Sequence, residues 1–318
     1  MKNEKYYNEA LGVMQEVKKA IIGKESCIHL IMAAILAGGH ILVDDIPGVG
    51  KTTLAIAFAK AMALENKRTQ FTPDIMPSDI LGFTMYNKED GHFYYQPGTV
   101  MCNLFLADEI NRTSPKTQSA LLQVMEEGCV TVDGVTRAVP APFIVIATQN
   151  PAGSTGTQLL PESQLDRFMV CLSIGYPSLE DEIAIAKGKR NDIINLVGEV
   201  IDGEELLNIR KAVNDVYIKD EVYKYICLLA RETRVHPMIE LGLSPRGTIA
   251  LASMSKAAAF LSGRDYVVPD DTEGIFNAVA AHRILLSSKA RISKTGAEEI
   301  LGQIKNKVKK PRSVRSII

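Results

Sequence analysis

A glycine-rich segment with a lysine and two threonines lies at residues 45–53, where the chain reads Asp-Ile-Pro-Gly-Val-Gly-Lys-Thr-Thr. It matches the phosphate-binding pattern Gly-x-x-x-x-Gly-Lys-Ser/Thr, except that Asp45 stands in place of the first glycine. Gly48 and the glycine after it allow backbone N–H groups to surround a phosphate, and a helix beginning near Lys51 would direct its positive end at that phosphate. We expect Lys51 to reach the β and γ phosphates of a nucleotide and the Thr52 hydroxyl to hold Mg²⁺. The alternative is a chance glycine loop, but the flanking apolar strand and alanine-rich helix argue against it.

An apolar run that ends in two acids follows at residues 103–109, Asn-Leu-Phe-Leu-Ala-Asp-Glu. Carboxylates at the end of a buried strand are costly unless a cation or water satisfies them. Asp108 fits a residue that fixes Mg²⁺ through its water shell, and Glu109 fits a base that orients an attacking water. Alone, the pair could instead cap the next segment, but the strand and the loop at 45–53 favour the catalytic interpretation.

Two further polar residues follow apolar segments. Asn150 ends the run Ile-Ala-Thr-Gln-Asn and could sense a γ-phosphate, although a polar strand-to-loop transition is the ordinary alternative. Arg167 lies in the segment 160–168, Leu-Pro-Glu-Ser-Gln-Leu-Asp-Arg-Phe. It could pair with Asp166 beside it, or it could reach a neighbouring subunit's site as an arginine finger.

Arg246 follows Ser244 and Pro245 at the expected start of a helix. A cation is electrostatically unfavourable at a helix N-terminus, so an anionic partner would remove a conflict. A nucleotide γ-phosphate is one candidate for that partner.

The elements that must position these residues follow a regular order. Continuous apolar runs predict buried parallel strands at 40–44, 103–107, 143–147 and 169–174. Helical segments alternate with them, which indicates a doubly wound α/β sheet. After Tyr176-Pro177 we find only helical periodicity, at 179–190, 203–215, 219–233, 246–261 and 270–285. We therefore expect an α/β domain over 1–176 and an all-helical domain over 177–318.

Two hairpins are predicted in the first domain. One spans about 82–97 with its turn at Asn87–Gly91, and the other alternates around Asp133-Gly134. The first is rich in aromatic residues, although the chain has no Trp and few aromatics: Phe71, Phe83, Tyr86, Phe93, Tyr94 and Tyr95 lie in or just before it. They could form a contact surface, or they could pack on their own hairpin face.

Composition limits the remaining possibilities. The 318 residues carry 36 Lys and Arg against 37 Asp and Glu, so the chain is not built as a general polyanion binder. Its five cysteines have neither disulfide-framework nor zinc-site spacing. The N-terminus has no signal-peptide core, and the longest apolar run is too interrupted to span a bilayer. We expect a cytoplasmic protein with no membrane span.

The motifs together resemble an AAA+ ATPase, and specifically the MoxR family. The resemblance is carried by DDIPGVGKTTLA, QFTPDIMPSDILG, LFLADEINRTSPKTQSALLQVMEE, LPESQLDRF and LSPRG, and it extends from about Val17 to about Arg283. It implies a Mg-ATP-dependent homo-oligomeric ring, expected to be a hexamer. It implies an ATP-binding α/β domain followed by a helical lid, with a helix-2 insert at about 72–100 and a pre-sensor hairpin at about 128–140.

The resemblance also implies roles for individual residues. Glu109 would be the catalytic glutamate of Walker B, which acts as a base. Asn150 would be sensor 1, Arg167 the arginine finger and Arg246 sensor 2. Thr52 would bind Mg²⁺ directly and Asp108 through water. The nucleotide-binding positions implied are Ile22, Gly23, Pro47, Gly48, Val49, Gly50, Lys51, Thr52, Thr53 and Asp108.

The favoured function is remodelling or maturation of a client protein, with a von Willebrand A-domain protein as partner. A magnesium-chelatase-like metal-insertion subunit is the alternative. A nucleic-acid motor is disfavoured because the hairpin tip Asn-Lys-Glu-Asp at 87–90 is neutral to acidic. A non-hydrolysing scaffold is disfavoured by the intact Glu109.

Overall fold

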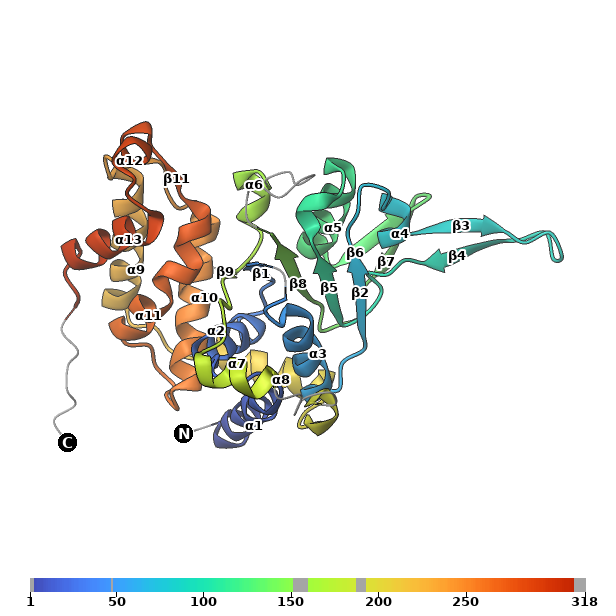
Figure 1. Ribbon diagram of the computed structural model, residues 1–318, viewed down its shortest axis with the longest axis horizontal. Coiled ribbons are helices and arrows are strands. Elements are labelled where there is room, and N and C mark those ends of the chain that lie inside the picture. Colours follow the sequence, from blue (N-terminus) through green and yellow to red (C-terminus); the bar gives the residue numbers. More distant parts are fainter. Residues whose placement is uncertain (1–2, 47, 151–159, 187–192, 312–318) are drawn as a thin grey trace.

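A parallel five-stranded sheet forms the centre of the N-terminal half in a computed structural model (Figure 1). The structure describes residues 3–46, 48–150, 160–186 and 193–311. The strand order is β2-β5-β8-β1-β9. The strands are β1 (Ile41–Asp44), β2 (Asn66–Gln70), β5 (Leu104–Asp108), β8 (Ile144–Gln149) and β9 (Val170–Leu172). Because every pairing is parallel, all five strands end at the same edge of the sheet.

Both faces of this sheet are buried, as the continuous apolar runs predicted. Leu104 and Leu106 of β5 belong to one buried cluster, whereas Phe105 and Ala107 belong to another on the opposite face. The first cluster is covered by α1 (Glu4–Ala20), α2 (Glu25–Leu36) and α3 (Lys51–Ala61), and the second by α5 (Pro115–Glu127). The predicted α/β class is therefore confirmed.

The edge strand β2 was missed by the sequence analysis. Its sequence, Asn-Lys-Arg-Thr-Gln, has no apolar residue, and three of its five residues are exposed. It is held by main-chain pairing with β5, in which Gln70 lies opposite Asp108. A polar edge strand gives no hydrophobic pattern for a sequence analysis to detect.

The C-terminal half is mostly helical. Its helices are α7 (Leu179–Ala186), α8 (Gly203–Asn214), α9 (Asp220–Val235), α10 (Pro245–Leu261), α11 (Pro269–Ala280), α12 (Ser288–Ser293) and α13 (Ala297–Lys307). The last helices of this half lie at one end of the molecule, whereas α7 and α8 lie beside the N-terminal helices (Figure 1). The expectation that it contains no strand is wrong, because β10 (Ile239–Leu241) pairs with β11 (Leu285–Leu286). These strands are too short to show an alternating pattern.

One buried cluster joins the two halves of the chain. It runs from α1 and α3 to α10 and α11. In addition, the N–H of Val200, far beyond residue 176, donates to the carbonyl of Ala61. The division of the chain at residue 176 therefore stays a prediction.

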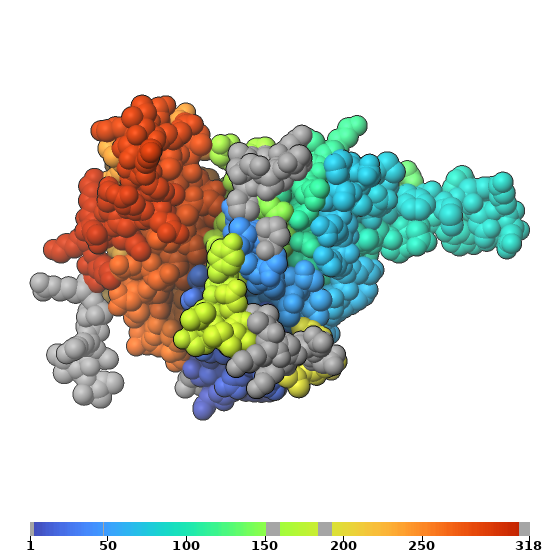
Figure 2. Space-filling model, in the orientation of Figure 1, coloured from blue at the N-terminus to red at the C-terminus, as the bar shows by residue number. Residues whose placement is uncertain are grey.

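Both predicted hairpins are present. The strands β6 (Cys129–Val132) and β7 (Val135–Ala138) form the shorter one. The longer one, β3 (Gly82–Tyr86) with β4 (Phe93–Pro97), follows the short helix α4 (Pro77–Leu81) and projects from the body as a narrow arm (Figure 2). Two of its aromatic rings, Tyr86 and Phe93, pack against each other at 5.1 Å between centroids, yet both side chains stay exposed. Self-packing is therefore found for this pair, whereas a contact surface stays a prediction. Phe71 belongs to neither interpretation, because it is buried and packs against Phe105.

Candidate functional site

The glycine-rich loop lies between β1 and the start of α3. Gly48 and Gly50 have φ values of 87° and 92°, a left-handed backbone that favours glycine. The helix α3 begins at Lys51, so its free N–H groups open toward the loop. This loop is therefore built as an anion cradle. Pro47, one of the expected nucleotide-binding residues, lies outside the described residues.

Lys51 is held among acids at the centre of this cradle. Its ammonium donates to the Asp45 carbonyl at 2.6 Å and lies 3.4 Å from Asn150 Oδ1, and the residue is only 8% exposed. Burial lowers the pKa of Lys51, and Asp45, Asp108 and Glu109 partly oppose that shift. A buried ammonium with few partners gains most from a bound anion.

The two acids at the end of β5 have different surroundings. Asp108 is buried, and its carboxylate accepts hydrogen bonds from Thr148 Oγ1 at 2.6 Å and Arg68 Nη2 at 2.7 Å. Glu109 has a φ of 56°, in the left-handed region that is unusual for a non-glycine residue. Its backbone N–H donates to Thr148 Oγ1 at 2.9 Å, so one threonine orients both acids.

Three side chains hold the Glu109 carboxylate. Arg112 Nη1 donates to it at 2.7 Å, Asn150 Nδ2 at 2.9 Å and Gln70 Nε2 at 3.0 Å. Burial acts to raise the pKa of Glu109, but these hydrogen bonds outweigh it and hold the pKa below its usual range. The carboxylate is therefore ionised near neutral pH and can accept a proton from water.

The predicted phosphate and catalytic residues converge on one cavity of about 380 Å³. It is lined by Gly48, Gly50, Lys51, Thr52, Thr53, Arg68, Gln70, Asp108, Glu109 and Asn150. The Thr52 hydroxyl and the Asp108 carboxylate supply oxygen ligands of the kind that Mg²⁺ prefers. No group of three or more His, Cys, Asp or Glu that could form a metal cluster occurs in the part of the chain that the structure describes.

Four residues around these acids were missed by the sequence analysis: Arg68, Gln70, Arg112 and Thr148. Arg68 and Gln70 lie two residues apart on β2, so their side chains are on the same face of the sheet. Both line the cavity together with Asp108 and Asn150. Only the register of β2 on β5 reveals them, and β2 itself was not predicted. Arg112 lies three residues after Glu109, a spacing that could have indicated the ion pair.

Asp45, a departure from the usual loop pattern, has a structural partner set of its own. Its Oδ2 accepts from the Ser173 hydroxyl at 3.0 Å and from the N–H groups of Ile174 at 2.6 Å and Gly175 at 2.7 Å. A glycine here would leave these donors without an acceptor. The loop is thus tied to the segment that follows β9.

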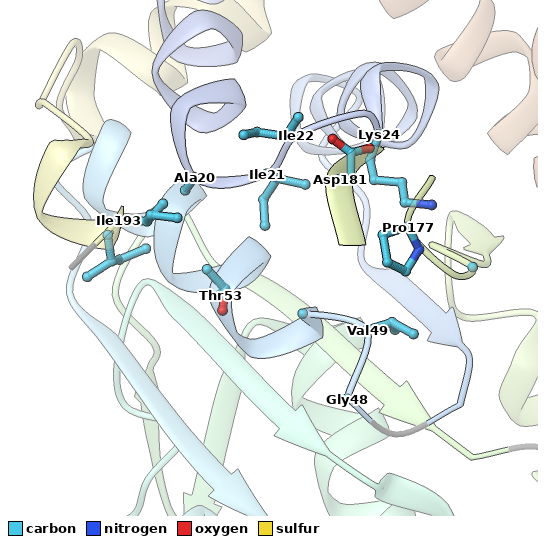
Figure 3. A pocket seen from close by; sticks show the side chains of 13 residues that line it. Ala20, Ile21, Ile22, Lys24, Gly48, Val49, Thr53, Pro177, Asp181 and Ile193 are labelled. Atoms are coloured by element: carbon cyan, nitrogen blue, oxygen red, sulfur yellow. The ribbon is translucent and has the colours of Figure 1, made fainter. Parts of the chain in front are cut away.

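A second cavity of about 380 Å³ continues from the loop toward the N-terminal helices (Figure 3). Ile21, Ile22, Val49 and Thr53 line it, and its largely apolar wall suits a purine base. Gly23 is required beside it, because its φ is 73° and a Cβ there would lie 2.2 Å from Asp181 Oδ2. Of the expected nucleotide-binding residues, Ile22, Val49 and Thr53 thus line this cavity, and Gly23 follows Ile22 in the chain.

Arg167 and Arg246 are not brought together with Lys51. They lie in a third cavity of about 240 Å³, where each forms an ion pair of 3.3 Å with Glu126. The alternative pairing of Arg167 with Asp166 is not found. Instead, Asp166 pairs with the buried Arg283 at 2.8 Å.

Comparison with known proteins places these features in a wider group. Residues 40–170 match the model of the ATPase family associated with various cellular activities (AAA), and residues 231–304 match the AAA lid domain. Protein YeaC of Bacillus subtilis, itself uncharacterized, is 44% identical over 94% of this chain and 93% of its own. Chaperone MoxR1 of Mycobacterium tuberculosis is 33% identical over 93% of this chain and 81% of its own. A crystal structure from Cytophaga hutchinsonii, assigned as an ATPase, has a TM-score of 0.89 and 37% identity, covering 96% of both chains.

Proposed function

Because this chain belongs to the MoxR family of AAA+ ATPases, we propose that it hydrolyses Mg-ATP in a homo-oligomeric ring to remodel or mature a client protein. The observation that carries the proposal is the convergence of Lys51, Asp108, Glu109 and Asn150 on one cavity beside the phosphate loop. The apolar cavity next to it would receive the adenine.

No helix in the described part of the chain is long and apolar enough to cross a membrane.

Each residue of the first cavity has a distinct task in hydrolysis. Lys51 would stabilise negative charge on the β and γ phosphates. Glu109 would orient the attacking water and accept its proton, while Asn150, hydrogen-bonded to Glu109, would hold that water in line. Thr52 and Asp108 would hold Mg²⁺, which would neutralise phosphate charge when bound.

Arg167 and Arg246 would act on the nucleotide of a neighbouring subunit. Their ion pairs with Glu126 lie apart from the cavity of their own subunit, and both side chains are partly exposed. A second subunit that presents its γ-phosphate here would complete the site, as an arginine finger requires. This arrangement needs a closed ring, which we expect to be a hexamer.

The aromatic arm is the surface best suited to a client. Phe83, Tyr86 and Phe93 are each about half exposed or more. Exposed aromatics on a projecting hairpin favour contact with protein, and the acidic tip disfavours nucleic acid. A von Willebrand A-domain partner would deliver the client.

Replacing the proposed base tests the assignment. The variant Glu109→Gln keeps the size of the side chain, but it has one acceptor oxygen in place of two and cannot accept a proton from water. We expect ATP affinity within a few-fold of the wild type and turnover reduced by roughly 10²–10⁴. Equilibrium binding of a fluorescent ATP analogue and phosphate release measure the two effects. Unimpaired hydrolysis would contradict the role of Glu109.

A further inference from the structure

Arg68 lies in the catalytic cavity although no motif places it there. It projects from the edge strand β2, and the alternation of side chains puts it on the same face as Gln70. Its Nη2 donates to Asp108 Oδ2 at 2.7 Å and to Gln70 Oε1 at 3.2 Å. The guanidinium thus directly contacts an acid that the nucleotide site needs.

Arg68 supplies the positive charge that a buried Asp108 needs. The carboxylate side chain is 11% exposed, and its other oxygen accepts only the neutral Thr148 hydroxyl. Within the described residues, Arg68 is the one cation that forms an ion pair with Asp108. A carboxylate buried to this degree is costly without such a partner.

The same carboxylate is the oxygen group that would hold Mg²⁺ in the function proposed above, on which this inference rests. Even with a water between the metal and the carboxylate, a divalent cation and the guanidinium at Asp108 would lie close enough for their like charges to repel strongly. The Arg68 side chain can move away from Asp108, because it is 48% exposed and lies at the edge of the sheet. Thr148, by contrast, stays on the opposite oxygen.

We propose that Arg68 is the resident counter-charge of Asp108 and competes with Mg²⁺ for it, so that the arriving metal displaces the guanidinium. Metal binding then includes the free-energy cost of breaking the ion pair between Arg68 and Asp108. The pair also keeps the acid satisfied while the site holds no metal.

Manganese binding to the protein–ADP complex tests the competition, because free Mn²⁺ can be counted by its electron paramagnetic resonance signal. ADP is chosen since hydrolysis cannot interfere. Removing the competitor in Arg68→Ala should tighten Mn²⁺ binding about two- to fivefold, the range set by a half-exposed ion pair. Arg68→Lys retains the charge and should stay near the wild type.

The neighbouring Lys67 provides the matched control. It lies on the same strand, but its ammonium donates to the Met101 carbonyl at 2.9 Å and does not line the cavity. Lys67→Ala should therefore bind Mn²⁺ as the wild type does. Without metal, Arg68→Ala should also melt at a lower temperature than the wild type in EDTA, and the difference should narrow when Mn²⁺ and ADP are added.

Two results would overturn the inference. If Arg68→Ala binds Mn²⁺ no more tightly than the wild type while still binding ADP, Arg68 does not compete with the metal. If the wild type itself binds neither ADP nor Mn²⁺, the proposed nucleotide site fails, and the inference fails with it.

Discussion

At the scale of single residues, Glu109 has a backbone conformation that is unfavourable for its residue type. Glu109 keeps a left-handed backbone that costs a non-glycine residue on the order of 1 kcal/mol or more. Thr148 and three side chains hold it there. Such strain is sustained only where the surrounding contacts determine the conformation, and here the carboxylate lines the cavity beside the glycine-rich loop.

His40 provides a residue-scale test of the fold beneath the site. It is buried, its Nε2 lies 3.0 Å from the Met125 carbonyl, and its Nδ1 accepts from the Val145 N–H at 3.0 Å. Burial lowers the pKa of His40 from 6.5 to about 4. At a pH between these two pKa values, His40 is protonated in the unfolded chain but not in the folded chain. The free energy of unfolding should therefore fall as pH decreases from 6.5 toward 4.

The loss that His40 causes should approach about 1.4 kcal/mol per pH unit inside that window. Chemical denaturation at several pH values would measure it. His40→Gln should show a shallower pH dependence, and the exposed His92→Gln should keep the wild-type slope. Burial also lowers the pKa of His282, which is half-buried, but this residue is present in every variant compared, so the difference isolates His40. Equal slopes in the wild type and His40→Gln would contradict this account.

At the scale of elements, the phosphate loop is fixed by a contact that the loop pattern does not contain. Asp45 ties the loop to the end of β9, whose continuation, Gly175 and Pro177, lines the second cavity. The same residue's carbonyl holds Lys51. The loop, Lys51 and the wall of the second cavity thus all contact one residue, through its side chain or its carbonyl oxygen.

Replacing Asp45 by Asn should therefore weaken both fold and binding. An amide has one acceptor oxygen and would turn N–H groups toward the donors of Ile174 or Ser173. We expect a loss of about 1–3 kcal/mol in the free energy of unfolding, measured with urea, and a weaker affinity for a fluorescent ATP analogue. Asp44→Asn is the control, because Asp44 Oδ1 has no hydrogen-bond partner among the residues that the structure describes. If the two variants lose the same stability and affinity, the tie is not specific to Asp45.

The helices and strands also show which features of the fold can be predicted from the sequence. Helix α5 begins after Ser114, whose hydroxyl accepts from the Thr117 N–H, and ends before Gly128, and such caps and glycine stops are local signals that a sequence carries. Apolar runs likewise predicted four of the five strands of the sheet. By contrast, β2 depends on main-chain pairing with a distant strand, and Arg68 and Gln70 depend on its register. Side-chain partners that arise from register leave no local pattern.

At the scale of the whole molecule, three distant parts of the chain meet at Glu126. Arg167 follows β8 and α6 (Glu162–Leu165), Arg246 lies in the first turn of α10, and Glu126 lies in the last turn of α5. Beside them, the buried Arg283 pairs with Asp166, and Asp166 also accepts from the Ser244 hydroxyl at 2.9 Å. These contacts fix the helical half against the sheet, so the two arginines are presented as one rigid surface.

If that surface serves a neighbouring nucleotide, subunits defective in opposite halves of the site should rescue each other. Glu109→Gln disables the acid of a subunit's own site, whereas Arg167→Ala disables the site of the next subunit. Each variant alone should be nearly inactive. In rings assembled from equal amounts, about a quarter of the interfaces would join an intact Glu109 to an intact Arg167, so ATP turnover should recover toward that fraction.

A second mixture distinguishes rescue between subunits from incomplete inactivation. Glu109→Gln and Lys51→Ala both act within one subunit's own cavity, so mixing them cannot create an intact site and should restore nothing. Recovery in the first mixture and not in the second requires that Arg167 act across an interface. Absence of recovery in both would place Arg167 in the site of its own subunit, contrary to its separation from Lys51 and its pairing with Glu126.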